Sequence, residues 1–135
     1  MTPFPLALLL MFSAPLSAHA ASGAWTQKTA GGSISVGQQI LSSRPLTPPA
    51  GIPRQATATV ISWQVTLLSP PPPGLDIKLC TPQRCVRLPS LRGTQTLTVP
   101  LLAHESYRFV YVVNRRGALT PPLNVVSNQL TVNYR

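Results

Sequence analysis

The sequence predicts an all-β fold, in the form of a single β-sandwich of about seven or eight short strands with one hairpin disulfide. Two observations predict the strands. Apolar and polar residues alternate along several short segments, and clusters of proline and glycine separate those segments. A third observation argues against helices, because no long window has a helical period without a proline or a cluster of β-branched residues.

The clearest predicted strand covers residues 57–68, where one side is apolar and the other mostly polar. This pattern is typical of a half-buried strand. Its apolar side is expected to consist of Thr59, Ile61, Trp63, Val65 and Leu67. Further strands are predicted over residues 33–41, 75–80, 85–88, 94–101, 106–114 and 124–134, the last with an interruption near Ser127 and Asn128.

Proline and glycine mark the predicted connections between these strands. Four prolines fall within residues 44–53, and residues 70–73 are all proline and precede Gly74. The sequence Arg115-Arg116-Gly117 suits a hairpin turn. The run at 70–73 has two interpretations, a polyproline ligand segment or a stiff connection. Its position between two well-patterned strands favours the connection.

Residues 1–20 have the features of a secretory signal peptide, which leaves residues 21–135 as a single β-rich domain. An apolar run covers residues 6–12, and the small residues Ala18 and Ala20 precede the predicted cut after Ala20. An uncleaved anchor is the alternative, but the run is much shorter than the roughly 20 apolar residues of a membrane span. We therefore expect export, with no integral membrane segment after cleavage.

Cys80 and Cys85 are predicted to form a structural disulfide. Both fall on the outward side of two neighbouring strands, and the loop at residues 81–84 sets them opposite each other across a hairpin. Cβ separations of about 4.5–5.5 Å in such pairs are close to disulfide range, and an exported protein meets oxidising conditions. The alternatives are a zinc site, which would need two further ligands, and a redox centre, which would favour the Cys-x-x-Cys spacing.

Charged residues are scarce and strongly unbalanced. The chain has 11 Lys and Arg against 2 Asp and Glu, a formal net charge of +9. After the predicted cut, the groups offered for general acid and base catalysis are Asp76, His104 and Glu105. We expect Asp76 to be a solvated charge beside Lys78, and the adjacent His104 and Glu105 to form a turn that enters a strand. The sequence therefore predicts no enzyme, no catalytic residue, no metal site and no cofactor.

The excess of positive charge predicts an anionic partner, unless it serves only to keep the surface soluble. For an exported protein such partners are anionic membrane surfaces, lipopolysaccharide, wall polymers or acidic protein patches. No nucleic-acid partner is expected, because Tyr107, Phe109 and Tyr111 alternate along one strand face, as core residues do. The candidate partner-binding residues lie around the cysteine hairpin and at a second turn: Arg84, Arg87, Arg92, Arg115 and Arg116.

Several short motifs occur in order along nearly the whole of residues 21–135. They are Gly23-Ala24-Trp25, Trp63, Pro73-Gly74-Leu75 leading into Leu79-Cys80, Cys85-Val86 and the closing Val132-Asn133-Tyr134-Arg135. The cysteine hairpin and the terminal Asn-Tyr-Arg are the more specific parts. In these motifs the chain resembles the flagellar FlhE proteins of Gram-negative bacteria. The prolines at residues 48–49 and 70–73 depart from the pattern of that family.

The resemblance implies a non-enzymatic accessory role in flagellum biogenesis and swarming, exerted from the periplasm on flagellar export-gate or rod proteins. It also implies chaperone-like behaviour and a limit on proton leakage through the export gate. It brings no catalytic residues, and the matching positions Trp25, Trp63 and Tyr134 are expected to be structural. The positive charge favours a competing hypothesis, an exported β-sandwich module that binds an anionic glycan or lipopolysaccharide. A pilus chaperone is a further alternative, although such proteins usually have two sandwich domains.

Overall fold

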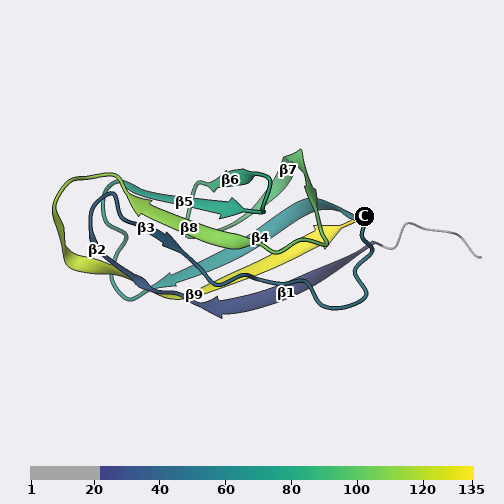
Figure 1. The fold of residues 1–135 in the computed structure, drawn as a ribbon, viewed down its shortest axis with the longest axis horizontal. Helices are drawn as coiled ribbons and strands as arrows, with labels where there is room; N and C mark the ends of the chain where they lie inside the picture. The colour runs from purple at the N-terminus through teal and green to yellow at the C-terminus, as the bar shows by residue number, and fades with distance from the viewer. Residues whose placement is uncertain (1–21) are drawn as a thin grey trace, which may run out of the picture.

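Two antiparallel β-sheets, packed face to face, make up the fold (Figure 1). The computed structural model describes residues 22–135, so the predicted signal peptide at residues 1–20 lies outside the described residues. No helix in the described part of the chain is long and apolar enough to cross a membrane. Residues 22–135 form nine strands: β1 (Gly23–Ala30), β2 (Ser33–Val36), β3 (Ile40–Ser42), β4 (Thr57–Leu67), β5 (Leu75–Cys80), β6 (Cys85–Leu88), β7 (Arg92–Leu102), β8 (Arg108–Val113) and β9 (Ala118–Tyr134).

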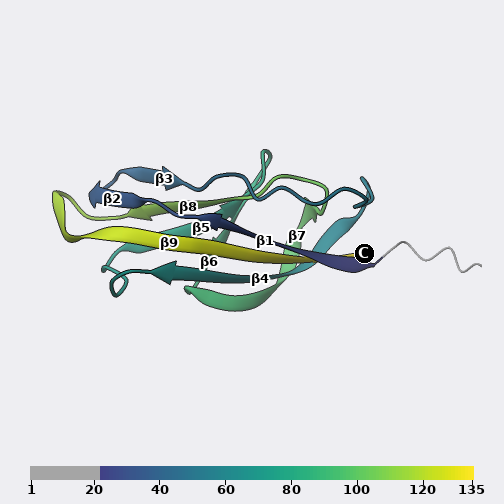
Figure 2. The ribbon, with the colours of Figure 1, turned by 90° about the horizontal axis from the view of Figure 1, so that it is seen from below.

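The larger sheet has the strand order β1-β9-β4-β7, and β2 pairs with β9 beyond the end of β1. The smaller sheet has the order β3-β8-β5-β6. Figure 2 shows β1, β9, β4 and β7 following one another across the larger sheet. The predicted all-β sandwich is therefore confirmed, with nine strands between residues 22 and 135 in place of seven or eight.

The two sheets bury one hydrophobic core between them. Tyr107, Phe109 and Tyr111 fill its centre from one side of β8 and the residue before it, and none of the three has exposed surface. The ring of Trp25 on β1 meets Tyr107 edge-on at a centroid distance of 5.7 Å. The hydroxyl of Tyr111 donates to the amide oxygen of Asn128 on β9. These contacts between the sheets fix how one lies on the other.

The three residues expected to be structural lie in the larger sheet. Trp25 and Trp63 are buried, and Tyr134 is half-buried near the end of β9. The indole N–H of Trp25 donates to the Ala103 carbonyl at 3.0 Å, and that of Trp63 donates to the Ser90 carbonyl at 2.8 Å. Ala103 and Ser90 lie in loops where the chain passes from one sheet to the other. Each indole therefore joins a strand of the larger sheet, through a hydrogen bond, to a loop that connects the two sheets.

The single strand predicted over residues 33–41 is wrong. The chain turns between β2 and β3, which belong to different sheets. At this turn Gln38 has a φ of 67°, and a Cβ on Gly37 would lie 1.6 Å from the carbonyl oxygen of Arg115. So close an approach requires glycine, and alternation of apolar residues does not reveal it. β1, which the sequence prediction left out, precedes this turn and pairs with β9 along its whole length.

The last strand is longer than predicted. β9 begins at Ala118 and runs through Ser127 and Asn128 without a break. The irregularity expected near these residues takes another form, because the register against β4 shifts between Val125 and Ser127. A bulge of this kind keeps the strand paired while it adds one residue on one side. β9 can therefore pair with β1, β2 and β4 and form the centre of the larger sheet.

A bulge also changes the buried side of β4. The register against both neighbouring strands shifts between Ala58 and Val60. Ala58 is buried, whereas Thr59, expected on the apolar side, is only half-buried. One inserted residue moves the alternation to the opposite face, which is why the prediction for Thr59 is wrong. The prediction holds from Ile61 to Val65, which are buried at every second position.

Candidate partner-binding surfaces

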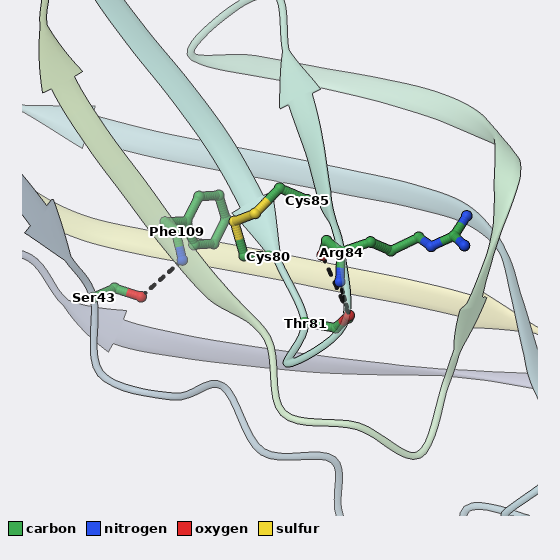
Figure 3. Close-up of a disulfide and its surroundings, with 6 residues drawn as sticks. All are labelled: Ser43, Cys80, Thr81, Arg84, Cys85 and Phe109. Carbon is green, nitrogen blue, oxygen red and sulfur yellow. Dashed lines mark hydrogen bonds between the residues drawn. A yellow bond between two sulfur atoms is a disulfide. The ribbon is translucent and has the colours of Figure 1, made fainter.

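The β5–β6 hairpin carries the predicted disulfide. Cys80 and Cys85 are directly opposed in the strand register, and the disulfide joins them (Figure 3). Inside the loop, the Thr81 N–H donates to the Arg84 carbonyl at 2.8 Å, and the Arg84 N–H donates to the Thr81 hydroxyl at 3.3 Å. These bonds hold the loop backbone, while the Arg84 side chain extends away from it into solvent (Figure 3).

The outer face of the smaller sheet is basic. Lys78 on β5 lies opposite Arg87 on β6, and Arg108 on β8 lies opposite Cys80. All three cations are exposed, because the residues that alternate with them supply the core. With the loop residue they form a surface that we term the basic face: Lys78, Arg84, Arg87 and Arg108.

Of the basic face, Arg84 and Arg87 are predicted from the sequence as partner-binding residues, whereas Lys78 and Arg108 are not. Strand alternation was the signal that could have found them, because Lys78 shares the outward side of β5 with Cys80. The side chain of Arg108 is also held by the segment that follows β3. Its guanidinium donates to the Ser43 carbonyl at 3.2 Å, and the Ser43 hydroxyl accepts from the Phe109 N–H at 2.9 Å (Figure 3).

Asp76 is the acidic side chain on the outward side of β5, and it lies next to the basic face. Its Oδ1 is 3.3 Å from Nε of Arg87, whose side chain is 79% exposed while that of Asp76 is 17% exposed. An ion pair with one partner so exposed contributes little to stability. The pair neutralises one cation, so the face has four cations against one carboxylate and keeps a net positive charge.

Arg92 does not join the basic face, although the sequence places it near the hairpin. It begins β7 in the larger sheet and lies opposite Gln64 on β4. The outer face of that sheet carries a central patch of uncharged polar side chains, between Lys28 on the edge strand β1 and Arg92 on the edge strand β7. Hydroxyl groups of this patch hydrogen-bond in pairs. The hydroxyls of Thr26 and Thr131 are 2.8 Å apart, and those of Ser62 and Thr94 are 3.0 Å apart. We term this central patch, without the two cations at its edges, the neutral face: Thr26, Ser62, Gln64, Thr94, Gln129 and Thr131.

Arg115 and Arg116 lie at one end of the sandwich, on the turn between β8 and β9 (Figure 1). Both side chains are exposed. Arg115 lines a cavity of about 260 Å³ together with the proline run at residues 70–73. The five predicted arginines therefore divide among three surfaces: the basic face, the edge of the neutral face and this proline-lined end.

The structure does not gather the titratable groups into one site. Asp76 lies on β5, whereas His104 and Glu105 lie in the segment before β8. Burial raises the pKa of the Tyr107 and Tyr111 hydroxyls above their ordinary value of 10.0, so both stay protonated near neutral pH. Within residues 22–135, no group of three or more His, Cys, Asp and Glu side chains could hold a metal ion.

Comparisons with known proteins agree on one family. Residues 31–135 match the family model described as Flagellar protein FlhE. The chain is 36% identical to Flagellar protein FlhE of Escherichia coli (strain K12), over 96% of this chain and 97% of that protein. It is 40% identical to the protein of the same name from Salmonella typhimurium, over the same shares of the two chains. A solved structure, "Crystal Structure of FLHE", has a TM-score of 0.78 and 37% identity, and covers 86% of this chain and 99% of its own.

Proposed function

Because the chain belongs to the flagellar FlhE family, we propose that it is a non-enzymatic periplasmic accessory protein of flagellum biogenesis and swarming. It acts on the flagellar export apparatus or the rod, in a chaperone-like manner that limits proton leakage through the export gate. The family match over residues 31–135 is the observation that carries the proposal. The relatives bear flagellar names and align over almost their whole length.

The disulfide supports a location outside the cytoplasm. Cytosolic thiols are kept reduced, whereas exported proteins retain disulfides. Cys80 and Cys85 are bonded in the fold, and this pair needs an oxidising compartment to persist. The predicted signal peptide at residues 1–20 is consistent with the same location. Together these features favour the periplasm, where a flagellar accessory protein can reach the export apparatus and the rod.

The basic face supports contact with an acidic partner. Its four cations lie on the outer side of the smaller sheet and its hairpin loop, and their charge attracts an acidic protein patch and speeds the encounter with it. On the larger sheet, the neutral face carries no charge, and the cations Lys28 and Arg92 lie apart at its two edges. We therefore propose that the protein meets its flagellar partner through the outer face of the smaller sheet.

The test is complementation of a strain that lacks the gene. The natural chain should restore swarming and cytoplasmic pH, whereas the variant Lys78→Glu/Arg84→Glu should restore neither. The matched control is Lys28→Glu/Arg92→Glu, which reverses two exposed cations on the larger sheet and should complement fully. Normal swarming and normal cytoplasmic pH in the strain without the gene would overturn the flagellar proposal. Equal failure of both variants would overturn the role of the basic face.

The basic face also favours a second candidate function, an exported module that binds an anionic glycan or lipopolysaccharide. Purified lipopolysaccharide tests it directly, because binding to a polyanion weakens as salt screens the charges. Under this second proposal, charge reversal at Arg84 and Arg87 abolishes binding, and charge reversal at Arg92 does not. Binding that is insensitive to salt or to the first pair of substitutions would reject it.

A further inference from the structure

Six prolines gather at the end of the sandwich where β4 leads to β5 and β8 leads to β9. Residues 70–73 and Pro121 and Pro122 line the cavity of about 260 Å³, together with Arg115. A second hollow, of about 310 Å³, lies beside Pro71 and Pro72 and extends to residues of β5, to the end of β6 and to the loop before β7. Since Pro71 and Pro72 line both hollows, the segment at residues 70–73 stands between them, and we term it the proline ridge.

The proline ridge is held in an extended form. The proline ring fixes φ near −65°, and a residue that precedes proline is driven to extended backbone. At the start of the ridge the Leu68 N–H donates to the Asn124 carbonyl at 3.0 Å. At its end the Leu75 N–H donates to the Pro72 carbonyl at 3.3 Å, across a turn in which Gly74 has a φ of +86°. A segment fixed at both ends loses little conformational entropy when a partner binds it.

The ridge offers ring surfaces and hydrogen-bond acceptors but no backbone donors. Pro70, Pro71 and Pro73 are exposed. Proline has no N–H, and within residues 22–135 no backbone N–H donates to the carbonyls of Pro70 or Pro71. A complementary surface therefore has flat apolar side chains that also carry an N–H or O–H donor, as tryptophan and tyrosine do. Proline-rich segments in this form are bound by grooves lined with aromatic side chains.

The charge beside the ridge is positive. Arg115 lines the first hollow, and its backbone is held because the Arg115 N–H donates to the Val113 carbonyl at 2.9 Å. The nearest acid in the sequence, Asp76, lies on the outward side of β5 with its carboxylate beside Arg87. The ridge therefore presents prolines next to a cation, and the complementary charge on a partner is a carboxylate.

We infer that the proline ridge, with Arg115 beside it, is a docking site for a protein partner whose groove is lined with aromatic side chains and carries a carboxylate. In this contact the present chain supplies the proline-rich element, and the partner supplies the groove. The inference goes beyond the proposed function, because it rests on a different end of the molecule from the basic face.

Three small probes of similar size test the chemistry of the site on the full domain. Indole-3-acetate is aromatic and anionic, tryptamine is aromatic and cationic, and cyclohexylacetate is anionic without an aromatic ring. Titrated while amide resonances are recorded by NMR, indole-3-acetate should give saturable shifts at Gly74, Leu75 and Leu119. The other two probes should bind at least about threefold more weakly. Tryptamine lacks the negative charge that contacts Arg115, and cyclohexylacetate lacks the aromatic ring.

Two variants make the test specific. Arg115→Gln should remove the preference for indole-3-acetate over tryptamine, and Pro71→Ala/Pro72→Ala should reduce binding of both aromatic probes. The matched control is Pro48→Ala/Pro49→Ala, which alters a pair of prolines in the loop between β3 and β4 and should leave binding unchanged. Shifts confined to the basic face, or a preference that survives Arg115→Gln, would overturn the inference. Neither result would bear on the flagellar role, which complementation tests separately.

Discussion

The two outer faces of the sandwich differ in charge although they rest on one core. The basic face gathers Lys78 and three arginines over the smaller sheet, beside Asp76. The neutral face carries hydroxyl and amide side chains over the larger sheet, with Lys28 and Arg92 separated at its two edges. Both sheets place alternate residues in the core, so the inner residues determine stability and leave the outer residues free to vary. Under the function proposed above, the clustering of the cations favours the basic face as the surface that meets an anionic partner.

If one core supports both faces, a cavity beneath either face should destabilise the whole domain. Phe109 lies under the basic face and Leu130 under the neutral face, and neither has exposed surface. We expect Phe109→Ala to lower the free energy of unfolding by about 3–5 kcal/mol and Leu130→Ala by about 2–5 kcal/mol. Urea denaturation measures both. A loss below about 1 kcal/mol at either position would break the comparison, since that face would then not depend on the shared core.

The tyrosines behind the basic face should make the domain sensitive to alkali. Burial raises the pKa of Tyr107 and Tyr111 in the folded state above the ordinary 10.0. The protonated tyrosines therefore contribute their full stability below about pH 10. As the pH rises above that value, the free energy of unfolding falls by up to about 1.4 kcal/mol per pH unit for each tyrosine. Denaturation at several pH values checks this. Tyr111→Phe should reduce the slope, whereas Thr131→Val on the neutral face should leave it unchanged.

The disulfide should matter more for the basic face than for the neutral face. It closes a loop with a sequence separation of 5, and a loop so short contributes about 2 kcal/mol by the chain-entropy estimate. The variant Cys80→Ala/Cys85→Ala should lose about that much in urea denaturation. Hydrogen exchange should also become faster at the Thr81 and Arg84 amides and stay constant at Thr131. Equal acceleration on both faces would mean that the bond acts on the fold as a whole.

The smallest expected effect concerns the carboxylate beside the basic face. Asp76→Asn removes the ion pair with Arg87, which should lower the free energy of unfolding by less than about 1 kcal/mol because Arg87 is so exposed. The same change raises the net positive charge of the basic face, so retention on a heparin column should move to higher salt. Earlier elution than the natural chain would show that the carboxylate assists anion binding instead of opposing it.

Alternation predicted the strands whose two sides differ most. β5, β6 and the aromatic face of β8 follow directly from the sequence pattern, and so does the pairing of Cys80 with Cys85. The pattern fails where a tight turn or a β-bulge interrupts the alternation. The turn at Gly37 and the bulge near Thr59 depend on close approach and on pairing with distant strands, which no local window contains.

The candidate site was predicted only in part, for a related reason. Arg84 and Arg87 are close in sequence to the disulfide and were found, whereas Arg108 reaches the same face only because β8 pairs with β5. Arg92 is equally close in sequence but starts a strand of the other sheet. Distance along the chain is thus a poor guide to a surface when consecutive strands cross between two sheets.

The most direct test of the account is site-specific photo-crosslinking in swarming cells. A photoreactive amino acid is placed at Arg84 on the basic face in one strain and at Gln129 on the neutral face in another, and the crosslinked proteins are identified by mass spectrometry. We predict that a flagellar export-gate or rod protein is crosslinked from position 84 and not from position 129. Crosslinking of that protein from position 129 alone, or of no flagellar protein from either position, would contradict the account.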